Sequence, residues 1–107
     1  MKIYVSGKIS GESLKDVRFY FEAAKARLMK KGYDAITPFE NGLPPSAPYA
    51  EHMKADIRML LGCDAIFMLP GWGYSPGARV EHEVARACGL RVYTEADMIE
   101  RGLGDDD

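Results

Sequence analysis

The stretch that decides the fold is DAIFMLPGWGYSPGARVEHEVARACGL, residues 64–90. It opens with an apolar run over residues 64–69, the pattern of a strand that is buried on both faces. A glycine-rich turn follows, and then an amphipathic helix over residues 78–88 and a strand over residues 90–93. Strand, crossover helix and strand in this order form a βαβ unit, which predicts a parallel sheet.

The rest of the chain repeats this alternation. A β-prone run at residues 2–6 ends in Gly7, and Ser13 with Asp16 predicts a capping box at the start of a helix that stops at Gly32. Residues 33–37 read as a strand, residues 38–48 as a loop rich in Pro and Gly, and residues 49–61 as a helix. Thr94 and Asp97 predict the cap of a last helix, which ends at Gly102.

These elements predict an α/β fold with a doubly wound parallel sheet of four to five strands. The expected architecture is a flavodoxin-like or Rossmann-like three-layer sandwich, whose ligands bind beyond the carboxyl ends of the strands. We expect one domain over residues 1–104 and a disordered acidic tail at 105–107.

Composition limits the classes of partner. The chain has 107 residues, 47% of them hydrophobic, and its 16 acidic and 14 basic residues give a formal charge of −2. Polymeric nucleic acid is not expected, because its binding needs a basic surface. Neither a signal peptide nor an apolar run of about 20 residues is recognisable, so we expect no membrane partner and a cytoplasmic location. Since a domain of this size has a small core, a homodimer or a larger homo-oligomer is expected.

Neither a metal nor a cofactor is expected. Cys63 and Cys88 are too few and too far apart for a zinc cluster, and we interpret both as small core residues. The candidate ligands His52, Asp56, Glu81 and His82 follow no recognised metal-binding spacing.

Glu81 stands out on the helix predicted over residues 78–88. A helical wheel places it within an apolar arc, whereas the other polar residues fall on the opposite side. The arc consists of Val80, Val84, Ala85, Ala87 and Cys88, and the polar side of Arg79, His82, Glu83 and Arg86. A carboxylate in this position is either a structural group paired with the backbone or an arginine, or a functional group in a cleft.

Two glycine-bearing turns lie at the same predicted edge of the sheet. Residues 71–77 should offer free backbone N–H groups, including that of Gly77, and the Ser75 hydroxyl to an anion, with Ser75 as N-cap and Pro76 at the first helical position. Residues 7–11 add Gly7, Lys8, Ser10 and Gly11. Residues 71–77 have neither the Walker nor the dinucleotide spacing, and they are also consistent with a simple turn that Ser75 caps and Pro76 follows. Residues 7–11 are equally consistent with a solvated loop.

Asp56 lies at the border of the apolar face of the helix predicted over residues 49–61, one turn after His52. This position suits a carboxylate that faces a cleft, and it equally suits a surface aspartate paired with a basic residue.

Three segments carry a resemblance to a known family. IYVSGKISG (3–11), KADIRMLLGCDAIFMLPG (54–71) and SPGARVEHEVARACGL (75–90) resemble the nucleoside 2-deoxyribosyltransferase family. Its 2′-deoxynucleoside 5′-monophosphate N-hydrolase branch is the most similar, and within it a small phage and bacterial subgroup.

The resemblance implies roles for individual residues. Glu81 would be the nucleophile, Asp56 the aspartate that assists departure of the nucleobase, and Tyr4 an active-site tyrosine on the first strand. Gly7 and Gly11 would frame the first substrate loop, and Ser75 would contact a 5′-phosphate.

The chain also differs from the family. Arg79 and Val80 replace the Gly and Tyr that precede the glutamate, and Lys8 and Ser10 replace a Ser and an Arg of the first loop. Family members complete their site with a residue of a neighbouring subunit, which has no match here.

The function expected from this pattern is cleavage of the N-glycosidic bond of a 2′-deoxynucleoside or its 5′-monophosphate, by hydrolysis or base transfer. The reaction would pass through a covalent glutamyl-deoxyribosyl intermediate and needs no cofactor. Two alternatives involve no catalysis: a nucleotide-binding module that uses the same loops, and a structural or regulatory dimer whose loops bind nothing.

Overall fold

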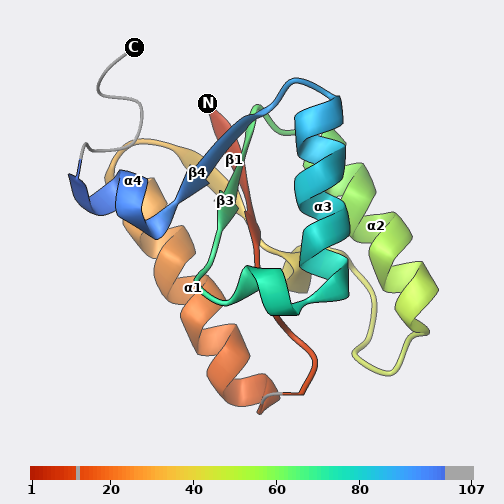
Figure 1. The fold of residues 1–107 in the computed structure, drawn as a ribbon. Helices are drawn as coiled ribbons and strands as arrows, with labels where there is room; N and C mark the ends of the chain where they lie inside the picture. The colour runs from red at the N-terminus through yellow and green to blue at the C-terminus, as the bar shows by residue number, and fades with distance from the viewer. Residues whose placement is uncertain (12, 101–107) are drawn as a thin grey trace.

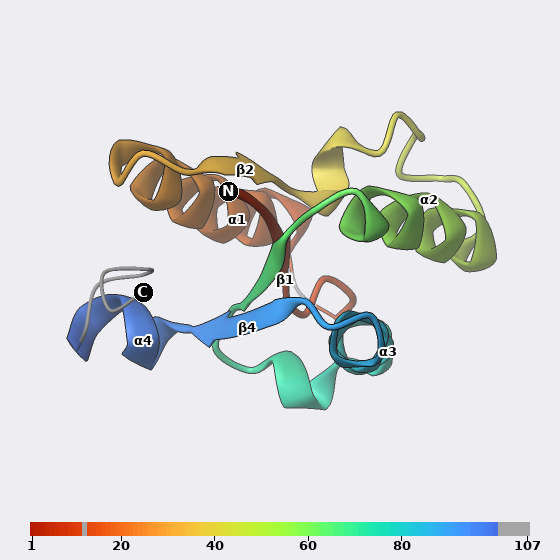
Figure 2. The ribbon, with the colours of Figure 1, turned by 90° about the horizontal axis from the view of Figure 1, so that it is seen from above.

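The protein contains one four-stranded parallel sheet, seen edge-on between the helices in Figure 2. The structure is a computed structural model that describes residues 1–11 and 13–100. The strands are β1 (Lys2–Ser6), β2 (Asp34–Ile36), β3 (Ala65–Met68) and β4 (Arg91–Thr94), in the spatial order β2-β1-β3-β4. This order is that of the flavodoxin-like doubly wound sheet, and the strand order reverses between β1 and β3.

The helices cover both faces of the sheet and complete three layers (Figures 1 and 2). On one face lie α1 (Leu14–Lys30) and α4 (Glu95–Glu100). The other face carries α2 (Tyr49–Leu61) and α3 (Pro76–Ala87). The predicted α/β three-layer fold is confirmed, with four strands. Among the described residues, no helix combines the length and the apolar character needed to cross a membrane.

Strand alternation divides the interior into two apolar clusters. Ile3 and Val5 of β1 pack toward α1, whereas Tyr4 packs on the side of α2 and α3. Since successive side chains of a strand point to opposite faces, Ser6 shares the face of Tyr4. The sheet therefore presents two hydroxyl groups to the layer that contains α3.

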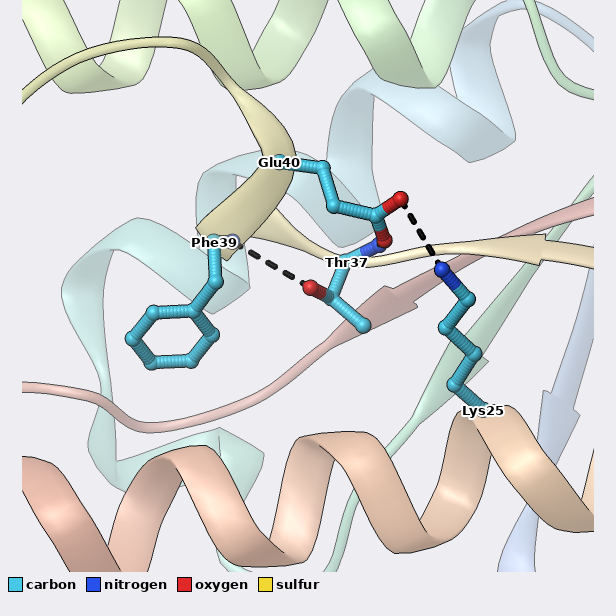
Figure 3. Close-up of polar contacts among 4 residues, drawn as sticks. All are labelled: Lys25, Thr37, Phe39 and Glu40. Atoms are coloured by element: carbon cyan, nitrogen blue, oxygen red, sulfur yellow. Dashed lines mark hydrogen bonds and ion pairs between the residues drawn. The ribbon is translucent and has the colours of Figure 1, made fainter.

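The loop that follows β2 is more ordered than its composition suggests. It opens with a 3₁₀ turn, η1 (Pro38–Glu40), where the sequence predicts no regular structure. Thr37 forms a capping box with this turn: Thr37 Oγ1 accepts from Phe39 N at 3.2 Å, and Glu40 Oε2 accepts from Thr37 N at 2.8 Å. Lys25 of α1 donates to Glu40 Oε1 at 2.9 Å (Figure 3). The loop is thus fixed to α1 directly after β2, at the carboxyl edge of the sheet.

Of the two predicted helix caps, the one at α4 is observed and the one at α1 is not. Ser13 occupies the N-cap of α1, but its side chain makes no capping hydrogen bond, so the expected capping box there is wrong. Thr94 N donates to Asp97 Oδ2 at 2.7 Å at the start of α4, as predicted. Gly102 and the tail at 105–107 lie outside the described residues.

The buried face of α3 differs from the predicted arc. Ala78, Glu81 and Ala85 are buried, whereas Val80 is 46% exposed and Ala87 is exposed. Small residues face inward because α3 packs closely on its neighbours. A Cβ added at Gly77 would lie only 3.0 Å from the Tyr49 hydroxyl of α2.

Two residues near this face, His82 and Cys88, also lie in surroundings that differ from the prediction. His82, predicted on the polar side, stacks on Trp72 with ring centroids 4.5 Å apart. Cys63 is buried as predicted, but Cys88 is exposed, so its assignment to the core is wrong.

Candidate functional site

A cavity of about 690 Å³ opens at the carboxyl edge of the sheet, where the strand order reverses. This is the place where doubly wound sheets bind their ligands. Its walls come from the loop after β1, the start of α1, the loop after β2, and the first turns of α2 and α3. The polar residues among its lining are Ser10, Arg18, Asn41, Tyr49, His52, Asp56, Ser75 and Glu81.

Glu81 lies in the wall of this cavity and is only 4% exposed. The hydroxyl of Tyr4 donates to Glu81 Oε2 at 3.0 Å, and Ser6 Oγ donates to Oε1 at 2.6 Å. Both donors come from the same face of β1, so each carboxylate oxygen has one fixed hydrogen bond. The carboxylate is therefore held in one orientation.

Burial controls the protonation of this group. Desolvation raises the pKa of Glu81 from 4.5 to about 7, although the hydrogen bonds from Ser6 and Tyr4 oppose the shift and the charge of Asp56 adds to it. Burial also raises the pKa of Tyr4 well above its ordinary value of 10.0, with the charge of Glu81 adding to the effect. Tyr4 consequently stays a neutral donor near pH 7, where Glu81 can gain or lose its proton.

The raised pKa predicts that Glu81→Gln stabilises the protein at alkaline pH. Between about pH 4.5 and pH 7 the folded protein keeps the Glu81 proton and the unfolded chain loses it, so the free energy of unfolding falls as pH rises. Above pH 7 the free energy of unfolding is lower than at pH 4 by about 3 kcal/mol, the full effect of the pKa difference. A glutamine carries no charge and can still bond both hydroxyls. We expect the variant to melt roughly 10 °C higher than the parent at pH 8.5.

The comparison is made by thermal unfolding of both proteins from pH 4 to pH 8.5. The difference should vanish toward pH 4, where Glu81 is protonated in the folded and the unfolded state. Glu83→Gln is the matched control, because Glu83 is exposed on the same helix. An equal or lower melting temperature of Glu81→Gln at pH 8.5 would contradict the assignment.

Asp56 is a second buried acid in the same wall. It is 5% exposed, and Asn41 Nδ2 donates to its Oδ1 at 2.8 Å. Burial raises the pKa of Asp56, while the hydrogen bond from Asn41 opposes the shift. Asp56, predicted at the border of the apolar face of α2, thus lines the cavity. The carboxyl groups of Asp56 and Glu81, both with raised pKa values, therefore share one site.

Residues of the first glycine turn line two different hollows, the cavity and a second groove. Gly7 and Ser10 line the cavity, but Lys8 lines a second groove of about 520 Å³ between α1 and the turn that follows β3. Gly11 lines neither hollow. A Cβ at Gly7 would lie 3.0 Å from Leu69 Cβ and 3.2 Å from Phe21 Cζ, so close packing requires this glycine.

The second glycine turn offers fewer donors than expected. The turn contains the 3₁₀ segment η2 (Trp72–Tyr74). The N–H groups of Trp72, Tyr74 and Ser75 bond to the carbonyl oxygens of Leu69, Gly71 and Trp72, respectively. These three N–H groups are therefore not available to an anion. Ser75 is the N-cap of α3, and its Oγ accepts from Ala78 N at 3.2 Å. Its hydroxyl hydrogen and the N–H of Gly77, in the first turn of α3, stay available at the cavity wall.

Four polar residues of the site are not singled out by the sequence: Ser6, Arg18, Asn41 and Tyr49. Ser6 could have been found from Tyr4, since residues two apart on a strand share a face. Asn41 lies in an irregular loop, where no periodicity indicates the direction of a side chain. Arg18 lines the cavity and places its guanidinium 5.4 Å from the centre of the Phe39 ring. Within the described part of the chain, no group of three or more His, Cys, Asp or Glu side chains could hold a metal ion.

Solved structures share this fold. A 2-deoxyribosyltransferase from Bacillus psychrosaccharolyticus superposes with a TM-score of 0.69 and 22% identity, over 88% of this chain and 71% of its own. A 2-deoxyribosyltransferase from Leishmania mexicana gives a TM-score of 0.66 and 23% identity, over 87% of this chain and 62% of its own. A CMP N-glycosidase from Clostridium botulinum gives 0.60 and 19%, over 88% and 67%.

Similarity at these identities shows a common fold. Among curated proteins, none matches the sequence. A family model described as a domain of unknown function, DUF4406, matches residues 1–94, which include both buried acids and both glycine turns. The chain therefore belongs to the DUF4406 family.

Proposed function

We propose that this protein cleaves the N-glycosidic bond of a 2′-deoxynucleoside or, preferentially, its 5′-monophosphate. One observation carries the proposal: hydrogen bonds from Tyr4 and Ser6 fix the Glu81 carboxylate in the wall of a cavity that also contains the buried acid Asp56. Glycosidases use such a pair of carboxyl groups, one as nucleophile and one as acid. The fold shared with deoxyribosyltransferases and a CMP N-glycosidase supports the substrate class.

The reaction begins with attack by one Glu81 oxygen on C1′. As the new C–O bond forms, the C1′–N bond breaks, its electron pair passes to the base nitrogen, and Asp56 supplies the proton that neutralises the leaving base. The product is a deoxyribosyl ester of Glu81. Water, deprotonated by Asp56, then attacks C1′ and releases Glu81 as a carboxylate, or a second base takes the place of water.

Hydrogen bonds from Tyr4 and Ser6 fit this sequence. They hold the carboxylate in place, and they stabilise its charge when it leaves C1′ in the second step. The cavity volume, about 690 Å³, is within the range of small-molecule sites, so a mononucleotide can be accommodated.

The direct test is incubation with the common 2′-deoxynucleosides and their 5′-monophosphates, followed by chromatography of the products. Release of free base together with deoxyribose or its 5-phosphate is the expected result, and addition of a second base distinguishes transfer from hydrolysis. Binding of nucleotides without any release of base would overturn the proposal.

Ser75 is the residue proposed to select the monophosphate. Its hydroxyl hydrogen lies at the cavity wall in the first turn of α3, where an anion is stabilised. We expect Ser75→Ala to lower kcat/KM for the monophosphate about 10-fold or more relative to the nucleoside, the usual effect of losing a hydrogen bond to a charged group.

The ratio of kcat/KM for the monophosphate to kcat/KM for the nucleoside separates this role from the loss of the helix cap, because a weaker cap lowers both values alike. Ser46→Ala is the control, because Ser46 is exposed in the loop before α2 and does not line the cavity. An unchanged ratio in Ser75→Ala would assign phosphate selection to another residue.

A further inference from the structure

Behind Asp56 runs a chain of hydrogen bonds that the reaction scheme does not use. Asn41 Nδ2 lies 2.8 Å from Asp56 Oδ1 and 2.9 Å from His52 Nδ1. His52 Nε2 lies 3.0 Å from the carbonyl oxygen of Pro44, and Leu43 N lies 2.9 Å from Asn41 Oδ1. The chain joins a loop and a helix around one catalytic carboxyl group.

Only one assignment of hydrogens satisfies all four contacts. The backbone N–H of Leu43 can only donate, so the Asn41 atom facing it must be the oxygen. The amide nitrogen of Asn41 then faces both Asp56 and His52 and donates one hydrogen to each. Consequently His52 Nδ1 is an unprotonated acceptor, and Nε2 carries the hydrogen that the Pro44 carbonyl accepts.

The loop that carries Asn41 is fixed on both sides. Before it, the η1 turn is held by its capping box and by the ion pair between Lys25 and Glu40, as Figure 3 shows. After it, the Leu43 N–H and the Pro44 carbonyl bond to Asn41 and His52. The Asn41 amide therefore has a defined place and a defined direction.

This direction has a consequence for Asp56. Because Oδ1 accepts a hydrogen from Asn41, a proton bound by Asp56 resides on Oδ2. With the amide reversed, the Asn41 oxygen would face Oδ1 and draw the proton there. The orientation seen in the structure thus leaves Oδ2 as the proton-bearing oxygen.

We propose that Asn41 and His52 are positioning residues that assign the acid proton of Asp56 to Oδ2 for delivery to the departing base. Asn41 is occupied by protein groups at both amide hydrogens, so it orients the acid and has no hydrogen left to donate to the base. His52 acts through Asn41 as the acceptor that prevents the amide from reversing. The inference rests on the proposed function.

The test compares two substrates in the same variants. One is an accepted nucleotide, and the other is a substrate whose base already carries a positive charge, such as an N7-methylated purine nucleotide, which departs without a proton. For Asn41→Leu we expect the single-turnover rate of cleavage of the neutral base to fall about 100-fold, the scale of a misplaced catalytic group, with substrate affinity nearly unchanged. On the charged base the same rate should fall less than about 3-fold, whereas a purely structural role would lower both rates equally.

His52 supplies the matched pair of substitutions. His52→Leu should reproduce the loss seen in Asn41→Leu, while His52→Gln, whose side-chain oxygen can accept from Asn41, should restore most of the activity on the neutral base. His82→Gln is the control, because His82 stacks on Trp72 of the η2 turn and does not line the cavity.

Nitrogen-15 NMR of the imidazoles tests the hydrogen-bond chain independently of turnover. At pH 8 the parent protein should show His52 with hydrogen on Nε2 only, and Asn41→Leu should change the signals of His52 but not those of His82. Hydrogen on Nδ1, or equal losses on both substrates in Asn41→Leu, would overturn the positioning role alone. Failure of the parent protein to release either base would overturn the proposed function itself.

Discussion

Glu81→Gln is expected to reduce base release by at least about 10⁴-fold while the protein stays folded. The amide oxygen is a poor nucleophile, and among the described residues no other carboxylate is fixed by Tyr4 and Ser6 as Glu81 is. Measurement of free base by chromatography, with enzyme at high concentration, covers this range. The higher melting temperature expected for the same variant shows that the loss is chemical and not a consequence of unfolding.

Glu83→Gln is the matched control for activity as well. Glu83 lies two residues further along α3, its side chain is 72% exposed, and its neighbours are His82 and Arg86 on the outer side of the helix. We expect activity within about 2-fold of the parent, as for an ordinary surface substitution. Full base release by Glu81→Gln, or an equal loss in both variants, would contradict the nucleophile assignment.

A covalent adduct provides the second line of evidence for Glu81. A 2′-fluorinated arabino-nucleotide destabilises the oxocarbenium-like transition state of both steps, so the glycosyl ester should accumulate and appear as an increase in intact mass. Peptide mapping is expected to place the increase on Glu81. An adduct on Asp56 would reverse the roles of the two acids.

Asp56→Asn is expected to lower kcat about 10²- to 10⁴-fold for a substrate with a neutral base, the usual contribution of a general acid. Asparagine has nearly the shape of aspartate, and its oxygen can still accept from Asn41, so the local structure should persist. What it lacks is the proton that a neutral base needs on departure.

The same variant should retain most of its activity on a substrate with an N7-methylated purine, since that base departs without protonation. Single-turnover measurements on both substrates isolate the cleavage step from hydrolysis of the ester, in which Asp56 also takes part. Equal losses on the two substrates would show that Asp56 orients the sugar and does not act as an acid.

Local sequence patterns determined the elements of this protein. The helix predicted over residues 49–61 is observed with the same bounds, and each predicted strand is found within one or two residues. Such patterns succeed because the period of a helix or a strand, its cap and its stop are written in consecutive residues. Position 81 could be selected in the same way, as an acid that falls among apolar residues on a helical wheel.

The wheel nevertheless gave the wrong centre for the buried face of α3. It weighted large apolar residues such as Val80, whereas close packing against α2 and the sheet selects small ones, Ala78 and Ala85. Which face of a helix is buried depends on the shape of its neighbours, and that information is not contained in the helix itself.

Only the tertiary structure decided how the site is assembled. The two donors to Glu81 are 75 and 77 residues away in the sequence, and they reach it because β1 occupies the middle of the sheet beneath α3. Asn41 bonds to Asp56 from an irregular loop. Lys8 lines the second groove and not the cavity, although it belongs to the first glycine turn. The sequence by itself thus determined the elements and the candidate acids, because periodicity is local. The partners and protonation of those acids follow from strand order, packing and burial, which arise only when distant segments meet.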